Sequence, residues 1–233
     1  MQLENATVFI TGANRGLGRV FAQTALARGA RKVYAAARQP GSITLPGVVP
    51  VKLDVTSEDD VRAAAELAAD TTLVINNAGI AAFGSFTAAD AEQQLRRHLE
   101  TNLFGTLRVA QAFAPVLARH GGGALLNVAS VASWISGPLL GNYAVSKAAV
   151  WSLSNALRHD LQGQGTQVLT LHMGFVDTDL TEGIDQPKST PQDIVARAFD
   201  ALEAGASEVL ADELTQRVKA GLSAEPAVYL ASR

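Results

Sequence analysis

Short apolar runs alternate along the chain with longer alanine-rich segments in which apolar residues recur at helical spacing. This pattern is typical of a parallel sheet with helices on both faces, because the strands of such a sheet are buried on both sides. It predicts seven strands, at Ala6–Ile10, Lys32–Ala36, Val49–Asp54, Leu73–Asn76, Ala124–Val128, Gln167–His172 and Glu208–Leu210. We therefore expect an α/β protein with one doubly wound, mostly parallel sheet.

Two predicted helix starts carry capping residues. Ser57 is followed three residues later by Asp60, and Thr190 is followed by Pro191 in the first turn, so both sequences look like capping boxes. The irregular connections are short except for Val176–Ser189, which follows the sixth strand and is a candidate substrate-covering loop. Because no linker-like tract interrupts the pattern, we expect residues 1–233 to form a single domain.

Composition narrows the class of protein. The chain has 233 residues, 48% of them apolar, and no cysteine, which is enough to bury one core without disulfides. A net charge of −3 without a basic cluster argues against a nucleic-acid partner or an anionic membrane. Neither a signal-like N-terminus nor an apolar run of about 18 residues is present, which predicts a cytoplasmic protein. The four histidines lack metal-ligand spacing, so no metal site is expected.

The sequence TGANRGLG, Thr11–Gly18, joins the first strand to a helical segment, Arg19–Ala27. This order of strand, glycine turn and helix places backbone N–H groups against a pyrophosphate. Gly12 would permit the tight turn, Gly16 the close approach of the ligand, and Gly18 the contact between helix and sheet. The spacing G-x-x-x-G-x-G differs from the common dinucleotide fingerprint, and an ordinary glycine-rich loop is the alternative.

Two further strand ends carry polar residues. Asp54 closes the third strand, and the sequence NNAG, Asn76–Gly79, follows the fourth. Open α/β sheets bind ligands at the carboxyl ends of their strands, so Asp54 is a candidate contact for the adenine edge. Alternatively, Asp54 caps the helix that begins near Ser57, and Asn76 and Asn77 only form a turn.

The end of the second strand bears on the choice of nicotinamide. Sites that prefer NAD usually place a carboxylate there, which holds the ribose 2′-hydroxyl and would repel a 2′-phosphate. Here Ala37 takes that position, and Arg38 follows with donors suited to a phosphate. Arg15 in the glycine turn is placed to reach the same phosphate from the other side. A single arginine is more often a solvated side chain, but the two together predict NADP(H).

Tyr143 and Lys147 stand four residues apart on a predicted helix and therefore share one face. A tyrosine with a pKa of about 10 is a poor acid–base catalyst at neutral pH, and a fixed ammonium beside it would stabilise the phenolate. Ser130, at the end of the fifth strand, is placed to donate to a substrate carbonyl oxygen. A turn or cap role is the alternative for Ser130, and Ser133 is a competing choice.

The segments TGANRGLG, NNAG, ETNLFG, NVAS and YAVSK occur in an order that resembles the short-chain dehydrogenase/reductase family. The resemblance covers nearly the whole chain and implies a Rossmann-type fold and hydride transfer between NADP(H) and a carbonyl/alcohol pair. It implies that Tyr143 is the general acid in carbonyl reduction and that Lys147 lowers its pKa and binds the nicotinamide ribose. It further implies that Ser130 orients the substrate oxygen and that Asn102, which the residues alone would not single out, holds a water in a proton relay.

The residues and the resemblance together predict a set of cofactor contacts. They are Gly12, Asn14, Arg15, Gly16, Leu17, Gly18, Arg38, Asp54, Val55, Asn77, Ala78, Gly79, Tyr143, Lys147, Gly174, Val176 and Thr178. Family members carry a Pro-Gly turn after the sixth strand, but Met173 replaces the proline here, which leaves the local backbone less restricted in φ.

The candidate walls of a substrate pocket are Ala81–Phe83, Trp134–Leu140, Phe175 and Val176–Ser189. The first three are mostly apolar, which predicts a ketone or aldehyde substrate with hydrophobic substituents. Alternatively, Trp134 and Phe175 pack in the core or at a subunit contact.

The long predicted helices Ala88–Leu117 and Gly141–Leu161 contain more apolar positions than one sheet face covers, which predicts a homodimer or homotetramer. Purely intramolecular packing of these helices is the alternative. Two other functions also stay open. One is a regulatory protein that senses the cofactor without turnover. The other is a lyase or epimerase, although that class generally needs a larger substrate domain than the about 55 residues after Leu180 provide.

Overall fold

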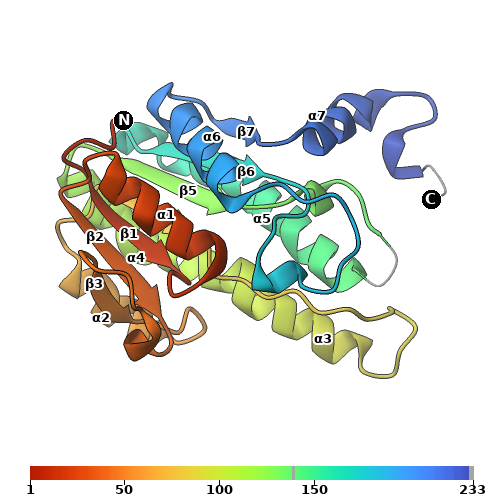
Figure 1. Ribbon diagram of the computed structural model, residues 1–233, viewed down its shortest axis with the longest axis horizontal. Helices are drawn as coiled ribbons and strands as arrows, with labels where there is room; N and C mark the ends of the chain where they lie inside the picture. Colours follow the sequence, from red (N-terminus) through yellow and green to blue (C-terminus); the bar gives the residue numbers. More distant parts are fainter. Residues whose placement is uncertain (138–139, 231–233) are drawn as a thin grey trace.

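A seven-stranded sheet forms the centre of the molecule in the computed structural model, which describes residues 1–137 and 140–230 (Figure 1). The strands follow the order β3-β2-β1-β4-β5-β6-β7, and every neighbouring pair is parallel. They are β1 (Thr7–Thr11), β2 (Lys32–Ala37), β3 (Val49–Lys52), β4 (Leu73–Asn76), β5 (Ala124–Val128), β6 (Gln167–His172) and β7 (Glu208–Leu210). The predicted doubly wound α/β fold is confirmed, with a sheet that is wholly parallel.

The predicted limits of the strands need three adjustments. β1 begins and ends one residue later than predicted, and β2 extends by one residue to Ala37. β3 ends at Lys52 rather than Asp54, because its neighbour β2 ends at Ala37, the residue that pairs with Lys52. Beyond this point the Asp54 carbonyl accepts a hydrogen bond from Ser57 N, and the chain turns toward the next helix.

Helices cover both faces of the sheet (Figure 1). One face carries α1 (Gly16–Ala27) and α6 (Pro191–Glu203), and the other carries α2 (Glu58–Leu67), α4 (Gly105–Arg119) and α5 (Gly141–Asp160). Side chains alternate along β1, so that Val8 and Ile10 pack in the core beneath α1 and α6. Phe9 points the opposite way, and its ring centroid lies 4.5 Å from that of Phe113 on α4. The two apolar faces of each strand account for the unbroken hydrophobic runs in the sequence.

The two predicted helix caps form. The Ser57 hydroxyl accepts a hydrogen bond from Asp60 N at 3.2 Å, and the Thr190 hydroxyl accepts one from Asp193 N at 3.1 Å. The Asp60 carboxylate does not accept from the backbone of Ser57. It forms an ion pair with Lys52 and accepts a hydrogen bond from Asp54 N. The first motif is therefore a simple N-cap and not a reciprocal capping box.

The predicted helix Ala88–Leu117 forms with different limits and a π-helical stretch within it. It begins at Ala91 and runs through α3 (Ala91–His98), a π-helical segment at Leu99–Phe104 and α4 to Arg119, with helical backbone angles at both junctions. Within this π segment, the wider turn lets the side chain of Asn102 reach the neighbouring elements while its carbonyl still accepts from the Thr106 hydroxyl at 2.7 Å. Periodicity alone did not predict the π segment, because the residues on both sides keep a helical pattern.

The loop after β6 is closed at its base. Asp177 N donates to Ser189 O at 3.0 Å, and Ser189 N donates to Phe175 O at 2.9 Å. The predicted loop Val176–Ser189 contains a short 3₁₀ turn at Asp179–Thr181, and its two ends are joined by a β-bridge between Val176 and Ser189. Within residues 1–137 and 140–230, no helix is both long and apolar enough to cross a membrane.

Candidate active site

The carboxyl ends of β1 and β4 lie side by side, at the point where the strand order reverses and ligands bind in such sheets. Asn77 joins the two ends: its side-chain amide donates to the carbonyls of Thr11 and Gly12 at 2.9 and 3.0 Å. In return, the Thr11 hydroxyl accepts from the N–H groups of Asn77 and Ala78 at 3.0 and 2.9 Å. Asn77 is thus more than a turn former, since it fixes the glycine turn to the neighbouring strand.

The spacing of the three glycines follows from close contacts in this turn. Gly12 has a φ of +65°, in the left-handed region that favours glycine. A Cβ on Gly18 would overlap the Gly12 carbonyl, so helix α1 could not pack this closely with any other residue there. A Cβ on Gly16 would lie 3.7 Å from the Cβ of Thr178, which places the loop after β6 opposite the turn. Two predicted cofactor contacts, Gly16 and Thr178, are therefore neighbours.

The N-terminus of α1 is suited to an anion. The first turn of α1 contains no acidic residue, and its N-cap, Arg15, makes no side-chain capping bond. Asn14 and Leu17 flank this N-terminus and are partly exposed. Leu17 also packs against the core beneath α1.

The two arginines predicted to bind a 2′-phosphate differ in their surroundings. Arg38 is exposed at the end of β2. Arg15 forms an ion pair with Asp179 of the loop after β6, at 2.9 Å, and the two side chains are 65% and 58% exposed. Such an exposed pair contributes little to stability, so Arg15 can exchange Asp179 for a phosphate at small cost.

Asp54 and Val55 lie at the end of the third strand. The Asp54 carboxylate accepts from the backbone N–H and the hydroxyl of Thr56 at 2.9 and 2.8 Å. The alternative that Asp54 caps α2 is wrong, because Ser57 occupies that position. Val55 is buried and packs tightly on Gly105, where a Cβ would lie 2.7 Å from the Val55 side chain.

Ser130 and Tyr143 meet beyond the end of β5. The Ser130 hydroxyl accepts from Ala132 N at 3.1 Å and lies 3.4 Å from the Met173 carbonyl oxygen, and its side chain is close enough to Tyr143 to lower the pKa of the phenol. Ser133 is turned away, since its hydroxyl donates to the backbone carbonyl of Lys147 at 3.0 Å. This geometry favours Ser130 over Ser133 as the partner of the tyrosine. Burial raises the pKa of Tyr143, and the hydrogen bond from Ser130 opposes the rise.

Lys147 lies on the same face of α5 but serves another partner. Its Nζ donates to the carbonyl of Val128 at 2.7 Å and lies 5.6 Å from the centroid of the Tyr143 ring. Burial lowers the pKa of Lys147 to about 8. Burial thus dominates the pKa at both groups, and the lowering of the Tyr143 pKa by Lys147 stays a prediction.

Asn102 is the most tightly held member of the group. Its amide accepts from Ile80 N at 2.8 Å and donates to Ile80 O at 3.0 Å and to the Ser146 hydroxyl at 2.9 Å. A Cβ on Gly79 would lie 3.2 Å from the Asn102 side-chain oxygen and 3.8 Å from Lys147 Nζ. Thus Gly79, Asn102 and Lys147 converge. Sequence reasoning missed Ser146, although its place between Tyr143 and Lys147 in YAVSK was a usable signal.

The end of β6 is anchored from two sides. Met173, which stands where the family has proline, is buried, and its carbonyl accepts from Val131 N at 2.8 Å. Gly174 N donates to the carboxylate of Asp212 at 2.6 Å, and Asp212 also caps α7 (Glu213–Ala220). Sequence reasoning missed Asp212, because a capping aspartate before a helix gives no sign of a second, distant partner.

Aromatic and aliphatic side chains are exposed on two of the predicted pocket walls. Phe83 is 61% exposed and Leu180 is 49% exposed. Phe86, which was not predicted, is 52% exposed, and its ring covers Gly141, two residues before Tyr143. Part of the predicted wall Trp134–Leu140, namely residues 138 and 139, lies outside the described residues.

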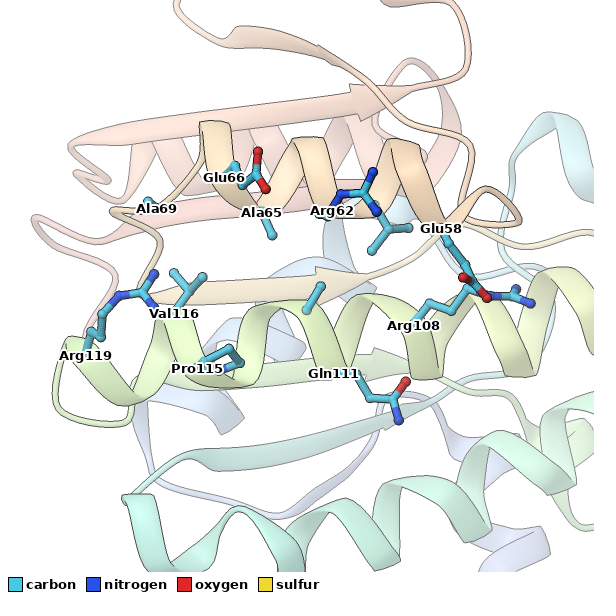
Figure 2. Close-up of a pocket in the computed structure, with 12 residues that line it drawn as sticks. Glu58, Arg62, Ala65, Glu66, Ala69, Arg108, Gln111, Pro115, Val116 and Arg119 are labelled. Atoms are coloured by element: carbon cyan, nitrogen blue, oxygen red, sulfur yellow. The ribbon is translucent and has the colours of Figure 1, made fainter.

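A separate groove lies between α2 and α4 (Figure 2). It has a volume of about 800 Å³, and its charged lining residues are Glu58, Arg62, Glu66, Arg108 and Arg119. None of the predicted catalytic or cofactor-binding residues lines it. The groove is therefore distinct from the candidate active site, which is defined by the convergence of the strand ends. Among the described residues, no group of three or more His, Asp or Glu side chains is arranged to hold a metal ion.

A glycine turn on the first strand of an open parallel sheet, together with a serine, a tyrosine and a lysine at the same edge, defines a dinucleotide-dependent oxidoreductase. Residues 6–189 match the family model described as short chain dehydrogenase. The chain belongs to the short-chain dehydrogenase/reductase family. It is an enzyme of the kind that acts on CH–OH groups with a nicotinamide cofactor.

Several relatives are similar over most of the chain. A short chain dehydrogenase from Burkholderia cenocepacia J2315, solved in complex with NADP, is 36% identical with a TM-score of 0.93, over 97% of this chain and 96% of that one. The sorbitol dehydrogenase of Cereibacter sphaeroides is 33% identical over 79% of this chain and 76% of its own length. The short chain dehydrogenase tazN of Aspergillus terreus is 31% identical over 82% of this chain, which spans 45% of tazN.

We predict a pH-dependent stability from the buried Lys147. Its pKa is about 8 in the folded chain against a usual 10.5, so between these values the unfolded chain binds a proton that the folded chain does not. The free energy of unfolding without cofactor should therefore rise with pH in this window, by up to about 1.4 kcal/mol per pH unit. Lys147→Met should remove that rise, as measured by urea unfolding from about pH 8 to about pH 10.

The window stops at about pH 10, because the raised pKa values of Tyr34 and Tyr143 make stability fall above that pH. Lys52→Met is the matched control, since the Lys52 side chain is 67% exposed. Its unfolding free energy should follow the parent curve. Parallel curves for the parent and Lys147→Met would contradict the prediction.

Proposed function

We propose that the protein is an NADP(H)-dependent oxidoreductase that interconverts a ketone or aldehyde and the corresponding alcohol. The observation that carries the proposal is the convergence of Ser130, Tyr143 and Lys147 at the strand edge that also holds the glycine turn. The residues present fit a dinucleotide: a Cβ on Gly16 would have no neighbour closer than 3.7 Å, and the first turn of α1 contains no acidic residue. When bound, the cofactor supplies the hydride.

The protein residues would position the carbonyl and move the proton. Ser130 donates a hydrogen bond to the carbonyl oxygen and holds it beside Tyr143. The Tyr143 phenol gives its proton to that oxygen during reduction, and its raised pKa keeps the proton in place at neutral pH. In the direction of alcohol oxidation the phenol must lose this proton, and a nearby ammonium on Lys147 favours that loss.

Lys147 and Asn102 would supply the second half of the proton path. The Lys147 ammonium, now bonded to the Val128 carbonyl, is a donor for the hydroxyls of the nicotinamide ribose. Asn102 would hold the relaying water, as the family resemblance implies. Its amide is fixed by Ile80 and Ser146, so a water bonded to it would keep a constant position.

The choice of NADP(H) over NAD(H) is supported by the end of β2. Ala37 leaves room where a carboxylate would repel a 2′-phosphate, and Arg38 is exposed beside it. Arg15 offers a second guanidinium from the glycine turn. The relative from Burkholderia cenocepacia, which is 36% identical, was solved with NADP.

A hydrophobic carbonyl compound is the substrate class that the exposed walls favour. Phe83, Phe86 and Leu180 expose large apolar surfaces, and such surface is costly to leave in water. The ring of Phe86 covers Gly141, two residues before Tyr143. The names of the relatives differ, from 3-oxoacyl-[acyl-carrier-protein] reductase to sorbitol dehydrogenase. The proposal for the substrate therefore rests on the residues of this chain.

A homodimer or homotetramer is the assembly that the outer helices favour. Phe104 of the π segment is 42% exposed, and Val145 on the outer face of α5 is 41% exposed. Both belong to the two long segments whose apolar content exceeds what the sheet covers. A second copy that packs on these helices would remove this surface from water.

Tyr143→Phe should reduce turnover by at least about 10²–10⁴-fold, because it removes the proton donor, while NADPH binding stays nearly unchanged. The measurement is NADPH oxidation with a panel of aliphatic, aryl and keto-ester carbonyls, together with a fluorescence titration of NADPH. Tyr34→Phe is the matched control, since its hydroxyl bonds Asp70 and Lys32 away from the candidate site. Full turnover by Tyr143→Phe would overturn the assignment, and NADPH binding without turnover by the parent would favour a cofactor-sensing protein.

The parent enzyme should use NADPH in preference to NADH, and Arg38→Gln should lower kcat/KM for NADPH by about ten- to a hundredfold. The basis is the loss of a charged hydrogen bond worth about 1.5–3 kcal/mol, which NADH does not make. Steady-state kinetics with both cofactors measure the ratio. Arg31→Gln, at the opposite end of the same strand, should leave it unchanged. Equal kcat/KM for the two cofactors in the parent would refute the preference.

Light scattering at several concentrations should give two or four times the chain mass of 24.3 kDa. Phe104→Asp should shift the protein toward the monomer, because it would bury a charge in the contact. Leu67→Asp, at a 59% exposed position on α2, is the control and should leave the mass unchanged. A mass of one chain at every concentration of the parent protein would rule out the proposed assembly.

A further inference from the structure

A second buried polar cluster lies directly behind Ser130. His172, at the end of β6, is fully buried, and its ring stacks on Trp134 with centroids 4.1 Å apart. Glu208 on β7 and Lys219 on α7 complete the group, with Lys219 Nζ 2.9 Å from the Glu208 carboxylate. We call these four residues the His172 cluster. The proposed reaction assigns no role to His172, Glu208 or Lys219.

Both ring nitrogens of His172 face hydrogen-bond acceptors. Nδ1 lies 3.0 Å from the backbone carbonyl oxygen of Ser130, and Nε2 lies 3.3 Å from a carboxylate oxygen of Glu208. Nε2 makes no hydrogen bond in the structure, so its contact with Glu208 is at ion-pair distance only. A neutral ring that donates from Nδ1 turns its Nε2 lone pair toward the carboxylate, whereas a second proton converts this contact into an attraction between opposite charges.

A second buried histidine in the same chain shows the opposite arrangement. His98 is also fully buried, but its Nε2 accepts from Ala82 N at 3.1 Å while Nδ1 faces the carbonyl of Gln94 at 2.7 Å. One donor and one acceptor suit a neutral ring with a single N–H. The contrast comes from the partners alone, because the two rings are equally buried.

The charges around His172 support a cationic ring. Contact with the imidazole is the main cause that lowers the pKa of Glu208 to about 2, and Lys219 adds to the effect. Lys219 is a like charge to an imidazolium, but Glu208 lies in contact with both cations. The face of Trp134 also favours positive charge, and Lys219 Nζ lies 4.6 Å from its ring centroid.

The contact with Ser130 gives His172 a link to the proposed catalytic group. On either side of Ser130, Ala129 N donates to Leu171 O and Val131 N donates to Met173 O, both at 2.8 Å. The Ser130 carbonyl between them accepts from Ser133 N at 3.0 Å and also faces the His172 ring nitrogen Nδ1. The imidazole is thus a second, side-chain partner of this carbonyl.

We propose that His172 is a positioning residue, held as an imidazolium between the Ser130 carbonyl and the Glu208 carboxylate, which fixes Ser130 and the Trp134 ring for turnover. The role in turnover rests on the proposed function of Ser130. The protonated state of the ring does not, since it follows from the partners of the two nitrogens.

Nitrogen NMR of the whole protein labelled with ¹⁵N-histidine tests the protonated state without any turnover. At neutral pH, long-range ¹H–¹⁵N correlations should show two protonated nitrogens for His172 and one for His98, with His172→Gln used to assign the signals. Glu208→Gln should reduce His172 to one protonated nitrogen. An unprotonated nitrogen on His172 in the parent would overturn the proposal, whatever the enzyme activity.

Kinetics test the positioning role. His172→Gln should lower kcat for carbonyl reduction by about tenfold or more, because Ser130 loses a bond from a charged donor, while the Kd for NADPH changes less than about twofold. Glu208→Gln, at a partly exposed position that is less prone to unfolding, should give a smaller loss. His159→Gln, at the exposed end of α5, is the control.

The outcomes separate the two proposals. Unchanged kcat in both His172→Gln and Glu208→Gln would overturn the positioning role. Loss of turnover in Tyr143→Phe would still support the proposed function. If Tyr143→Phe retained full turnover, the proposed function would fail, and the NMR result would still decide the state of His172.

Discussion

The parallel pairing of β1 with β4 is the interaction on which the rest of the site depends. It brings the carboxyl ends of β1 and β4 together at the point where the strand order reverses. The connections that follow these two strands run to opposite faces of the sheet, and ligands bind in the crevice between such connections. Asn77 and Thr11 then lock the ends through four hydrogen bonds, so the glycine turn is held by the neighbouring strand. The carboxyl ends of β5 and β6 lie at the same edge of the sheet. Ser130 follows β5, and the loop that contains Thr178 follows β6.

Burial at this edge disfavours the charged forms of both Lys147 and Tyr143. Lys147 is buried with the Val128 carbonyl as its partner, and its pKa falls to about 8. Tyr143 is held in its neutral form by the same effect. A dinucleotide that brings ribose hydroxyls to Lys147 would change this balance, because a buried cation gains from every donor bond it can make.

Two sets of side-chain contacts hold the parts of the site that lie outside the hydrogen bonds between strands. The π segment turns Asn102 toward Ile80 and Ser146, which ties the segment after β4 to α5. On the other side, the end of β6 is attached through Asp212 to the cap of α7 and through His172 to Ser130. The late elements β7 and α7 therefore support the central residues, although they contribute none of the predicted catalytic groups.

The sequence by itself determined the sheet and the glycine turn and predicted Ser130, Tyr143 and Lys147 as a catalytic group, since strand periodicity and short motifs are properties of neighbouring residues. Four of the seven predicted strands have the limits observed in the structure. Only the tertiary structure decided the π segment before α4, the pairing of Arg15 with Asp179, the position of Phe86 over Gly141 and the two oxygen atoms that face His172. These features join residues far apart in the chain, and their contacts depend on strand register and helix packing that no local pattern encodes.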